Sequence, residues 1–347
     1  MYIKTSSVIK RMKSIVTTFF CCLLTCFHLH GQSNPIAVFE ELWLTFEQQY
    51  AGFELRKVDW DQLFDKYRPQ IDKQTDQKQL FKVCCELLQE LNDAHVNLID
   101  KSGKQVNRCN SNNFPNATNI LSEFSEQAFY AIVDSNLKRE GFNSLKTSQV
   151  IGYAQSDSLG YIRISKMAEN SKGLSQALDR LKDTKGIIID IRLNSGGTDH
   201  YLYQIAGRFA DEKRVGHYKT ERVKGTNTMT KAKAWYLKPY GKYQYKKPII
   251  ILTSDFTASA AEIFVLAMKE LPYVRTIGGF TNGATSHMKS IKLSNGWKVT
   301  LSNQIAYSAG MVNYEGVGIK PDILLSNHIE DDTDKVLLRA IEELKKK

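Results

Sequence analysis

The chain has 347 residues, a hydrophobic content of 42% and a formal net charge of +10, so it can bury a sizeable core and is not a disordered polypeptide. Four positive charges lie within the first 13 residues, and the others are scattered without a basic stripe between aromatic residues, which excludes a nucleic-acid-binding signature. The histidines beyond the N-terminal region stand far apart, and neither His-Glu-x-x-His nor Cys-x-x-Cys occurs, so we expect no metal and no cofactor.

Residues 1–31 are typical of a signal peptide. Basic residues precede an apolar run from Ile15 to Leu29, which has the length of a signal-peptide core and is short for a membrane span of about 20 residues. We expect export to the periplasm or the extracellular space, with Gly31 as the last residue of the leader and no membrane span after its removal. Because Leu29-His30-Gly31 fits a small-x-small cleavage site poorly, an uncleaved anchor remains the alternative.

Residues 35–98 are predicted to form a small helical subdomain. Apolar residues recur there at helical spacing, and Asn92-Asp93 ends the last helix before an alternating run that favours a strand. His95 stands at this junction, where a histidine is either a structural residue or a catalytic one. Residues 99–158 are predicted to be a polar loop followed by short strands, near 128–133 and 150–153.

Residues 159–326 alternate between strand and helix patterns, and a charged helix from Asp334 lies in the C-terminal segment 327–347. The alternation predicts crossover units, parallel strand pairing and helices on both faces of the sheet. A tyrosine-rich segment, 211–245, shows little periodicity and is interpreted as a packing segment or a flap, whereas Ser294-Asn-Gly-Trp297 predicts a hairpin turn. Expected strands cover 159–164, 186–192, 249–252, 288–293 and 298–301; expected helices cover 174–181 and 199–209.

Two loops follow buried strands at the edge where ligands gather in open α/β sheets. Ser259 begins a helix, so it is either a nucleophile near unpartnered helix amides or the first residue of a Ser-Ala-Ala-Glu262 capping box. Gly196-Gly197 is either a tight turn or a loop whose bare amides form an oxyanion hole, with Ala260 as a second donor.

Three phrases carry a resemblance to a known family: DIRLNSGG at 190–197, TASAAE at 257–262 and EGVGIKPD at 315–322. Together they resemble the serine peptidases that include the C-terminal processing (tail-specific) proteases, the tricorn core and the interphotoreceptor retinoid-binding protein repeats. The resemblance implies a crotonase-like α/β catalytic domain with Ser259 as nucleophile and oxyanion donors from Gly196, Gly197 and Ala260.

The resemblance also implies which residue acts as the base. Tail-specific members use a lysine about 25 residues after the serine, but that place is Ala284, and Lys289 is a poor substitute. Tricorn-type members use a histidine and a glutamate, and His95 and Glu315 occupy their places. A serine hydroxyl needs a base to take its proton, and a carboxylate orients that base, so these three residues would form a Ser-His-Glu triad.

The sequence therefore predicts an exported serine endopeptidase acting on peptide or protein substrates. Ala94 stands where tricorn has a further serine, and the chain between Val96 and Gly160 is too short for a PDZ domain, so none is expected. A catalytically inactive module that binds an apolar ligand or peptide on the same fold is the alternative. Hydrolysis of non-peptide esters would use the same triad.

Overall fold

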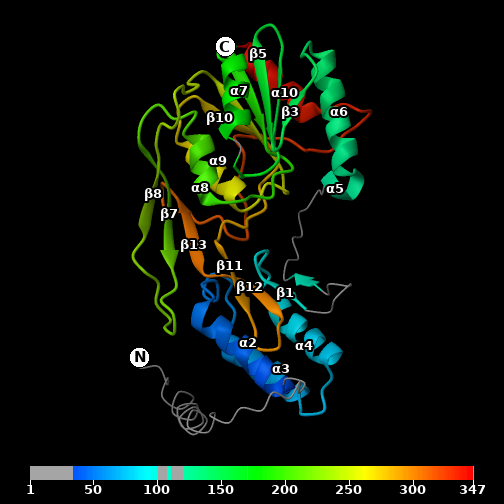
Figure 1. Ribbon diagram of the computed structural model, residues 1–347, viewed down its shortest axis with the longest axis vertical. Helices are drawn as coiled ribbons and strands as arrows, with labels where there is room; N and C mark the ends of the chain where they lie inside the picture. Colours follow the sequence, from blue (N-terminus) through cyan, green and yellow to red (C-terminus); the bar gives the residue numbers. More distant parts are fainter. Residues whose placement is uncertain (1–33, 101–107, 111–119, 170, 347) are drawn as a thin grey trace. The chain divides into compact units, whose positions relative to one another are not determined.

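Figure 1 presents the computed structural model, which describes residues 34–100, 108–110, 120–169 and 171–346. The predicted signal peptide, residues 1–31, lies outside the described residues. From Pro35 onward the chain forms one compact unit. Of the helices in the described residues, none combines the length and the apolar character that crossing a bilayer requires.

A seven-stranded sheet forms the centre of the larger α/β part, with strand order β14-β10-β9-β6-β5-β4-β3. The strands from β5 to β14 pair in parallel, and β4 and β3 add an antiparallel edge. All residues of β6 and β9 are buried, as expected for strands covered on both faces. The bounds are β3 Lys146–Ser148, β4 Ile151–Gln155, β5 Leu159–Ile164, β6 Gly186–Asp190, β9 Ile249–Thr253, β10 Val274–Gly278 and β14 Ile323–Leu324.

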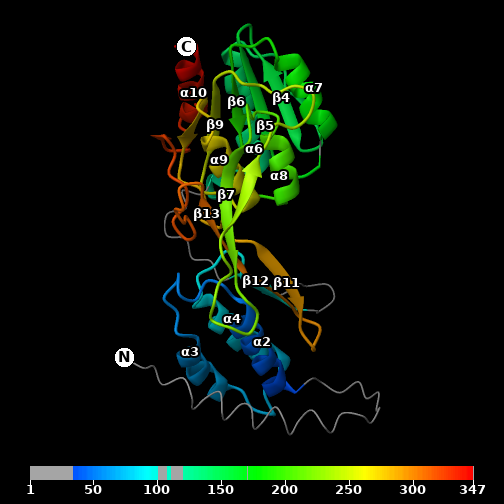
Figure 2. The same ribbon diagram turned by 90° about the vertical axis from the view of Figure 1, so that its left-hand side faces the viewer.

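Helices cover both faces of this sheet, which confirms the predicted α/β class (Figures 1 and 2). Alternate residues of one strand point to opposite faces: Ile249 and Ile251 pack with α7, α8 and α9, whereas Ile250 and Leu252 pack with α6 and α10. The helices are α6 Glu126–Arg139, α7 Ser171–Leu181, α8 Asp199–Ala206, α9 Ala260–Lys269 and α10 Lys335–Lys345.

The strand predicted near 128–133 is wrong, because these residues lie within α6. Ser125 caps this helix by accepting from the Ala128 amide at 3.1 Å, and the buried residues Phe129, Val133 and Leu137 recur every four positions. The apolar residues of this run therefore follow the period of a helix and not the period of a strand, and so short a run does not distinguish the two.

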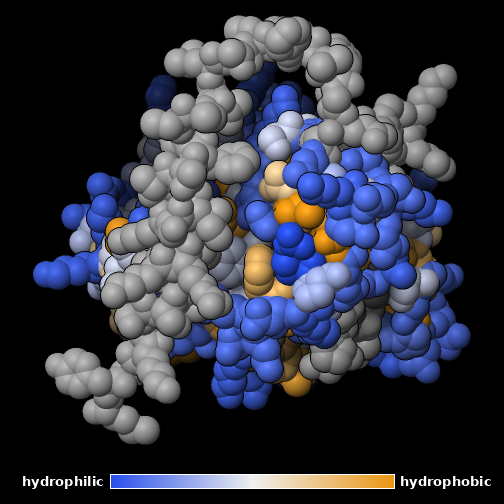
Figure 3. Space-filling view, turned by 90° about the horizontal axis from the view of Figure 1, so that it is seen from below, coloured by the Kyte–Doolittle hydropathy of each residue, from blue (hydrophilic) through white to orange (hydrophobic). Residues whose placement is uncertain are grey.

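Residues 35–89 contain the helices α2, α3 and α4, which lie beside a four-stranded sheet of order β11-β12-β1-β2. The β11–β12 hairpin forms as predicted, and β1 pairs with β12 in the register Asn97 to Thr300. Figure 3 views this end, where the described surface is largely hydrophilic with a small group of apolar side chains. The elements are α2 Pro35–Gln49, α3 Trp60–Tyr67, α4 Gln77–Gln89, β1 Asn97–Ile99, β2 Arg108–Asn110, β11 Met288–Lys292 and β12 Lys298–Ser302; a short helix α5, Ile120–Glu123, follows later.

The tyrosine-rich segment forms a hairpin that the sequence did not predict. Strands β7 (Arg214–Glu221) and β8 (Lys233–Leu237) join β13 (Gln304–Ser308) in an antiparallel sheet of order β13-β7-β8. An irregularity between Val215 and His217 interrupts the alternation of side chains, and such a bulge hides a period of two in the sequence.

Candidate active site

Ser259 lies at a sharp turn between β9 and α9. A side chain and a backbone amide of this turn reach the loop after β6: Thr257 Oγ1 donates to the Ile191 carbonyl at 3.0 Å, and the Ala258 amide donates to the Asn194 carbonyl at 3.1 Å. The two predicted loops, one carrying Ser259 and one carrying the glycine pair, are therefore held together.

The backbone of Ser259 is in an unusual conformation for a helix cap. Ser259 and Glu262 form the capping box, and Glu262 Oε2 accepts from the Ser259 amide at 3.0 Å. However, Ser259 has φ 57° and ψ −125°, whereas the caps Asp59 and Ser125 are extended. A non-glycine residue with positive φ stores strain that a capping role does not require, and such strain clusters at functional sites.

The Gly196-Gly197 loop packs directly against Ser259. A Cβ atom on Gly196 would lie 2.7 Å from the Ser259 Cβ atom, and one on Gly197 would lie 2.0 Å from the Met167 carbonyl oxygen. Gly196 and Gly197 have φ values of 106° and 153°, so only glycine fits this path without strain.

The backbone amides of this region differ in their availability. The Gly196 amide donates to Asn194 Oδ1 at 2.9 Å. Neither the Gly197 amide nor the Ala260 amide donates to any acceptor within the described part of the chain. Two free donors therefore stand on either side of Ser259, one from the loop and one from the first turn of α9.

Glu262 is fully buried beneath the Ser259 turn and accepts hydrogen bonds from the segment 281–284. Its Oε1 accepts from the Thr281 hydroxyl at 2.6 Å and from the Gly283 amide at 2.7 Å, and its Oε2 accepts from the Ala284 amide at 2.8 Å. Burial raises the pKa of Glu262 to about 7, and the hydrogen bonds from Thr281 and Gly283 oppose this rise. Position 284, which corresponds by spacing to the lysine of tail-specific members, is an alanine whose backbone amide binds Glu262.

The next two residues of the same segment hold Glu315. Its Oε2 accepts from the amides of Thr285 and Ser286 at 2.8 and 2.9 Å and from both hydroxyls at 3.0 Å. Its Oε1 accepts from the Arg56 guanidinium at 2.8 Å. Burial raises the pKa of Glu315, with Asp93 adding to the effect, whereas His95 and Arg56 act in the opposite direction.

His95 is buried and lies close enough to Glu315 to interact with it electrostatically. Asp93 Oδ1 accepts from the His95 amide at 2.8 Å, and Thr300 Oγ1 donates to the His95 carbonyl at 2.6 Å. The ring Nδ1 atom of His95 is buried and has no partner in the described residues. No hydrogen bond among these residues joins His95 to Ser259 or to Glu315.

Arg56 links the histidine turn to the glutamate, and sequence reasoning missed it. It donates to the Asn92 carbonyl and to Glu315 Oε1, and its Nε atom lies 3.7 Å from Asp93 Oδ2. Its side chain is only 10% exposed. No sequence signal marks it, because it lies in a polar turn where an arginine is usually solvated.

A cavity of about 350 Å³ adjoins Ser259, Ala260 and Gly197. Thr285 and Ser286 also line it, so the nucleophile candidate and the segment that holds Glu315 share one space. A second histidine, His287, lies on the same wall with its Nδ1 atom 3.3 Å from Asn303 Oδ1. Sequence reasoning singled out neither this histidine nor this cavity.

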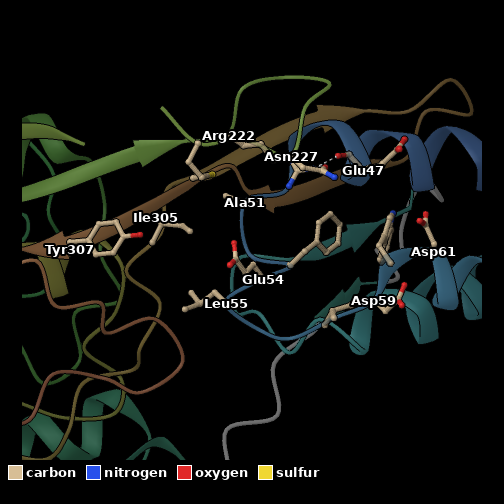
Figure 4. Close-up of a pocket in the computed structure, with 14 residues that line it drawn as sticks. Glu47, Ala51, Glu54, Leu55, Asp59, Asp61, Arg222, Asn227, Ile305 and Tyr307 are labelled. Carbon is tan, nitrogen blue, oxygen red and sulfur yellow. Dashed lines mark hydrogen bonds between the residues drawn. The ribbon is translucent and has the colours of Figure 1, made fainter. Parts of the chain in front are cut away.

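A larger cavity, of about 660 Å³, lies elsewhere and contains none of the predicted site residues. Figure 4 shows it between the turn after α2, the β7–β8 hairpin and β13, with Glu47, Glu54 and Asp61 among its lining residues. Ile305 and Tyr307 of β13 line this cavity, whereas Gln304 of the same strand lines the cavity at Ser259. Strand β13 therefore contributes to both cavities through alternate side chains.

Comparison with known families gives two matches along the chain. Residues 158–325 match peptidase family S41, and residues 36–89 match the tricorn protease C1 domain. The carboxy-terminal processing protease CtpA of Bacillus subtilis is 28% identical over 194 residues, which cover 55% of this chain and 39% of CtpA. The chain thus spans about two fifths of the length of the curated relatives it matches.

Solved structures resemble the whole described fold. A putative peptidase from Parabacteroides merdae superposes with a TM-score of 0.76 at 27% identity, covering 90% of this chain and 97% of that chain. Mature CPAF complexed with lactacystin superposes with a TM-score of 0.63 at 13% identity, covering 90% of this chain and 97% of its own. The second likeness concerns the fold alone.

Proposed function

The chain belongs to peptidase family S41 through residues 158–325, and on that basis we propose that it is a serine endopeptidase that cleaves peptide or protein substrates. Ser259 is the nucleophile, His95 the general base and Glu315 the acidic member of a triad of the tricorn type. The observation that carries this proposal is the strained Ser259 between two amides, those of Gly197 and Ala260, that have no acceptor in the described residues.

In the acylation step, Ser259 Oγ attacks the carbonyl carbon of the scissile bond while His95 takes the hydroxyl proton. The carbonyl oxygen becomes an oxyanion and accepts from the Gly197 and Ala260 amides. His95 then gives the proton to the leaving amine, and a water molecule repeats the sequence to release the acyl group. The Gly196 amide already donates to Asn194 Oδ1, so it is not an oxyanion donor. Gly196 instead lacks the Cβ atom that would clash with Ser259.

His95 is preferred to His287 as the base for two reasons. Its Nδ1 atom is buried without a partner in the described residues, and it lies close enough to Glu315 to lower the pKa of that carboxyl electrostatically, as expected for neighbours in a proton relay. The Nδ1 atom of His287 instead faces the Asn303 side chain. In substrate-free sites catalytic hydrogen bonds are often long and tighten only when substrate binds.

Labelling with a fluorophosphonate probe tests the triad. We expect the wild-type protein to be labelled, Ser259→Ala to be unlabelled, and His95→Ala to be labelled about 10² to 10⁴ times more slowly. His287→Ala is the matched control and should label at nearly the wild-type rate. Equal labelling of wild type and Ser259→Ala would refute the nucleophile, and loss of labelling in His287→Ala alone would move the base to His287. An unlabelled, folded wild-type protein would favour the binding module.

Export forms a separate part of the proposal. The basic residues before the apolar run from Ile15 to Leu29 support removal of a leader at Gly31. Fractionation of cells that express the full chain, followed by N-terminal sequencing, should find the protein outside the cytoplasm with a new N-terminus near Gln32. Recovery of the full-length chain from the membrane fraction would instead identify an uncleaved anchor.

A further inference from the structure

The cavity beside Ser259 contains one ion pair that the proposed reaction does not use. Lys219 of β7 donates to Asp199 Oδ2, and both residues line the cavity with Ser259. Their side chains are 8% and 20% exposed. Asp199 follows Gly197 by two positions and lies in the first turn of α8, where the helix dipole favours a negative charge.

The ion pair is held in a fixed place by aromatic neighbours. The Lys219 Nζ atom lies 5.0 Å from the centre of the Trp235 ring, which also lines the cavity. Behind Trp235, the His217 ring is stacked at 5.7 Å, and the Tyr203 ring is stacked on His217 at 5.7 Å. A lysine packed in this way cannot leave Asp199 to follow a substrate without losing both contacts.

Lys219 and Asp199 are the only lysine, arginine or carboxylate side chains among the described residues that line the cavity, and the remaining titratable lining residue is His287, whose Nδ1 atom faces the Asn303 side chain. Ile263 is buried and apolar, Met288 contributes a flexible apolar side chain, and Gln304 is an uncharged amide. A charged substrate side chain that entered would lose its hydration and find no unpaired counter-charge, which is unfavourable. An uncharged side chain would meet no such cost.

We infer that this cavity receives the substrate side chain that precedes the scissile bond, and that the balanced charges of Lys219 and Asp199 restrict it to uncharged residues. The inference rests on the proposed peptidase function, because it places the acyl side chain next to the amides of Gly197 and Ala260. It names two specificity-determining residues, and it predicts that unbalancing the pair in either direction changes which substrates are accepted.

Cleavage sites in dephosphorylated, unfolded casein, mapped by mass spectrometry, test the inference. We expect the wild-type protein to cut after uncharged residues at least about tenfold more often than after charged ones, corrected for composition. Asp199→Asn leaves the Lys219 charge uncompensated and should gain sites after Glu and Asp by about tenfold. Lys219→Met leaves the Asp199 charge and should gain sites after Lys and Arg instead.

The double variant Asp199→Asn/Lys219→Met is the matched control, because its cavity is again uncharged and it should return to the wild-type pattern. Single variants whose cleavage sites do not move, or move in the same direction, would overturn the inference. If the single variants fail to fold, the wild-type protein alone tests the inference, because frequent cleavage after charged residues would overturn it. Absence of any wild-type cleavage is a different result, because it contradicts the proposed function itself.

Discussion

Replacing Glu262 with Gln tests how the buried carboxylate beneath Ser259 is held. Burial raises the pKa of this group from 4.5 to about 7, so the folded protein binds its proton more tightly than the unfolded chain does. The stabilisation from this proton is present below about pH 4.5 and is lost as the pH rises through about 7. The difference between the two pKa values corresponds to about 3 kcal/mol.

Glu262→Gln removes this titration and also changes the hydrogen bonding. The carboxylate accepts from Ser259, Thr281, Gly283 and Ala284, but the glutamine NH₂ group cannot accept from the amides on its side. Each unsatisfied buried amide costs about 1 to 3 kcal/mol. The variant should therefore be less stable at every pH, and its deficit should shrink by about 3 kcal/mol between pH 4.5 and pH 7.5.

Urea unfolding of both proteins across this pH range measures the effect. Groups that titrate in both proteins cancel in the difference, and Glu342→Gln, an exposed site on α10, controls for the loss of a surface carboxylate. A difference that stays constant would show that Glu262 does not titrate in this range. A difference that grows with pH would contradict the raised pKa of Glu262, because it would mean that the four donors outweigh burial.

Three further substitutions test other parts of the site. Ser259→Gly removes the hydroxyl and relieves the strain of the positive φ. We expect hydrolysis to fall about 10³-fold or more, while the melting temperature stays the same or rises. A lower melting temperature with retained hydrolysis would identify Ser259 as a structural cap. In Gly197→Ala the new Cβ atom would clash with the Met167 carbonyl, so the backbone amide at position 197 must move. Loss of this oxyanion donor should lower kcat about 10² to 10³-fold. An unchanged kcat would show that the Gly197 amide is not part of the oxyanion hole. Arg56→Met leaves Glu315 without its cation and raises the pKa of that carboxyl further. The free energy of unfolding should therefore fall by about 3 kcal/mol at pH 8, and by less at pH 5, where more of the carboxyl is protonated. Equal losses at the two pH values would show that Arg56 does not stabilise the Glu315 carboxylate.

The sequence predicted the parallel sheet well because its strands are buried on both faces. Runs such as 186–190 and 249–253 contain hardly any polar residues, which predicts a buried strand. Each run is followed by a loop rich in small residues, which predicts where the strand ends. The hairpin at Ser294 to Trp297 was equally plain, because its turn residues determine the fold locally.

Contacts between distant segments were not predictable in the same way. The β7–β8 hairpin is half exposed and contains an irregularity, so its alternation was lost. The role of Arg56 depends on its hydrogen bond to Glu315, and the two residues are separated by 259 positions in the sequence. The pairing of Lys219 with Asp199 likewise depends on how β7 packs over α8. The candidate triad residues themselves remain predictions that the labelling experiment decides.

One short segment, 281–286, joins both acidic groups of the candidate site. It uses backbone amides and hydroxyls alone to hold Glu262 and Glu315, and the Gly316 amide in turn donates to the Gly283 carbonyl at 2.7 Å. Grafting these acidic groups onto another scaffold would therefore require residues 259–262, 281–286 and 315–318 to be transferred together. None of these three segments could change its position without breaking hydrogen bonds to another.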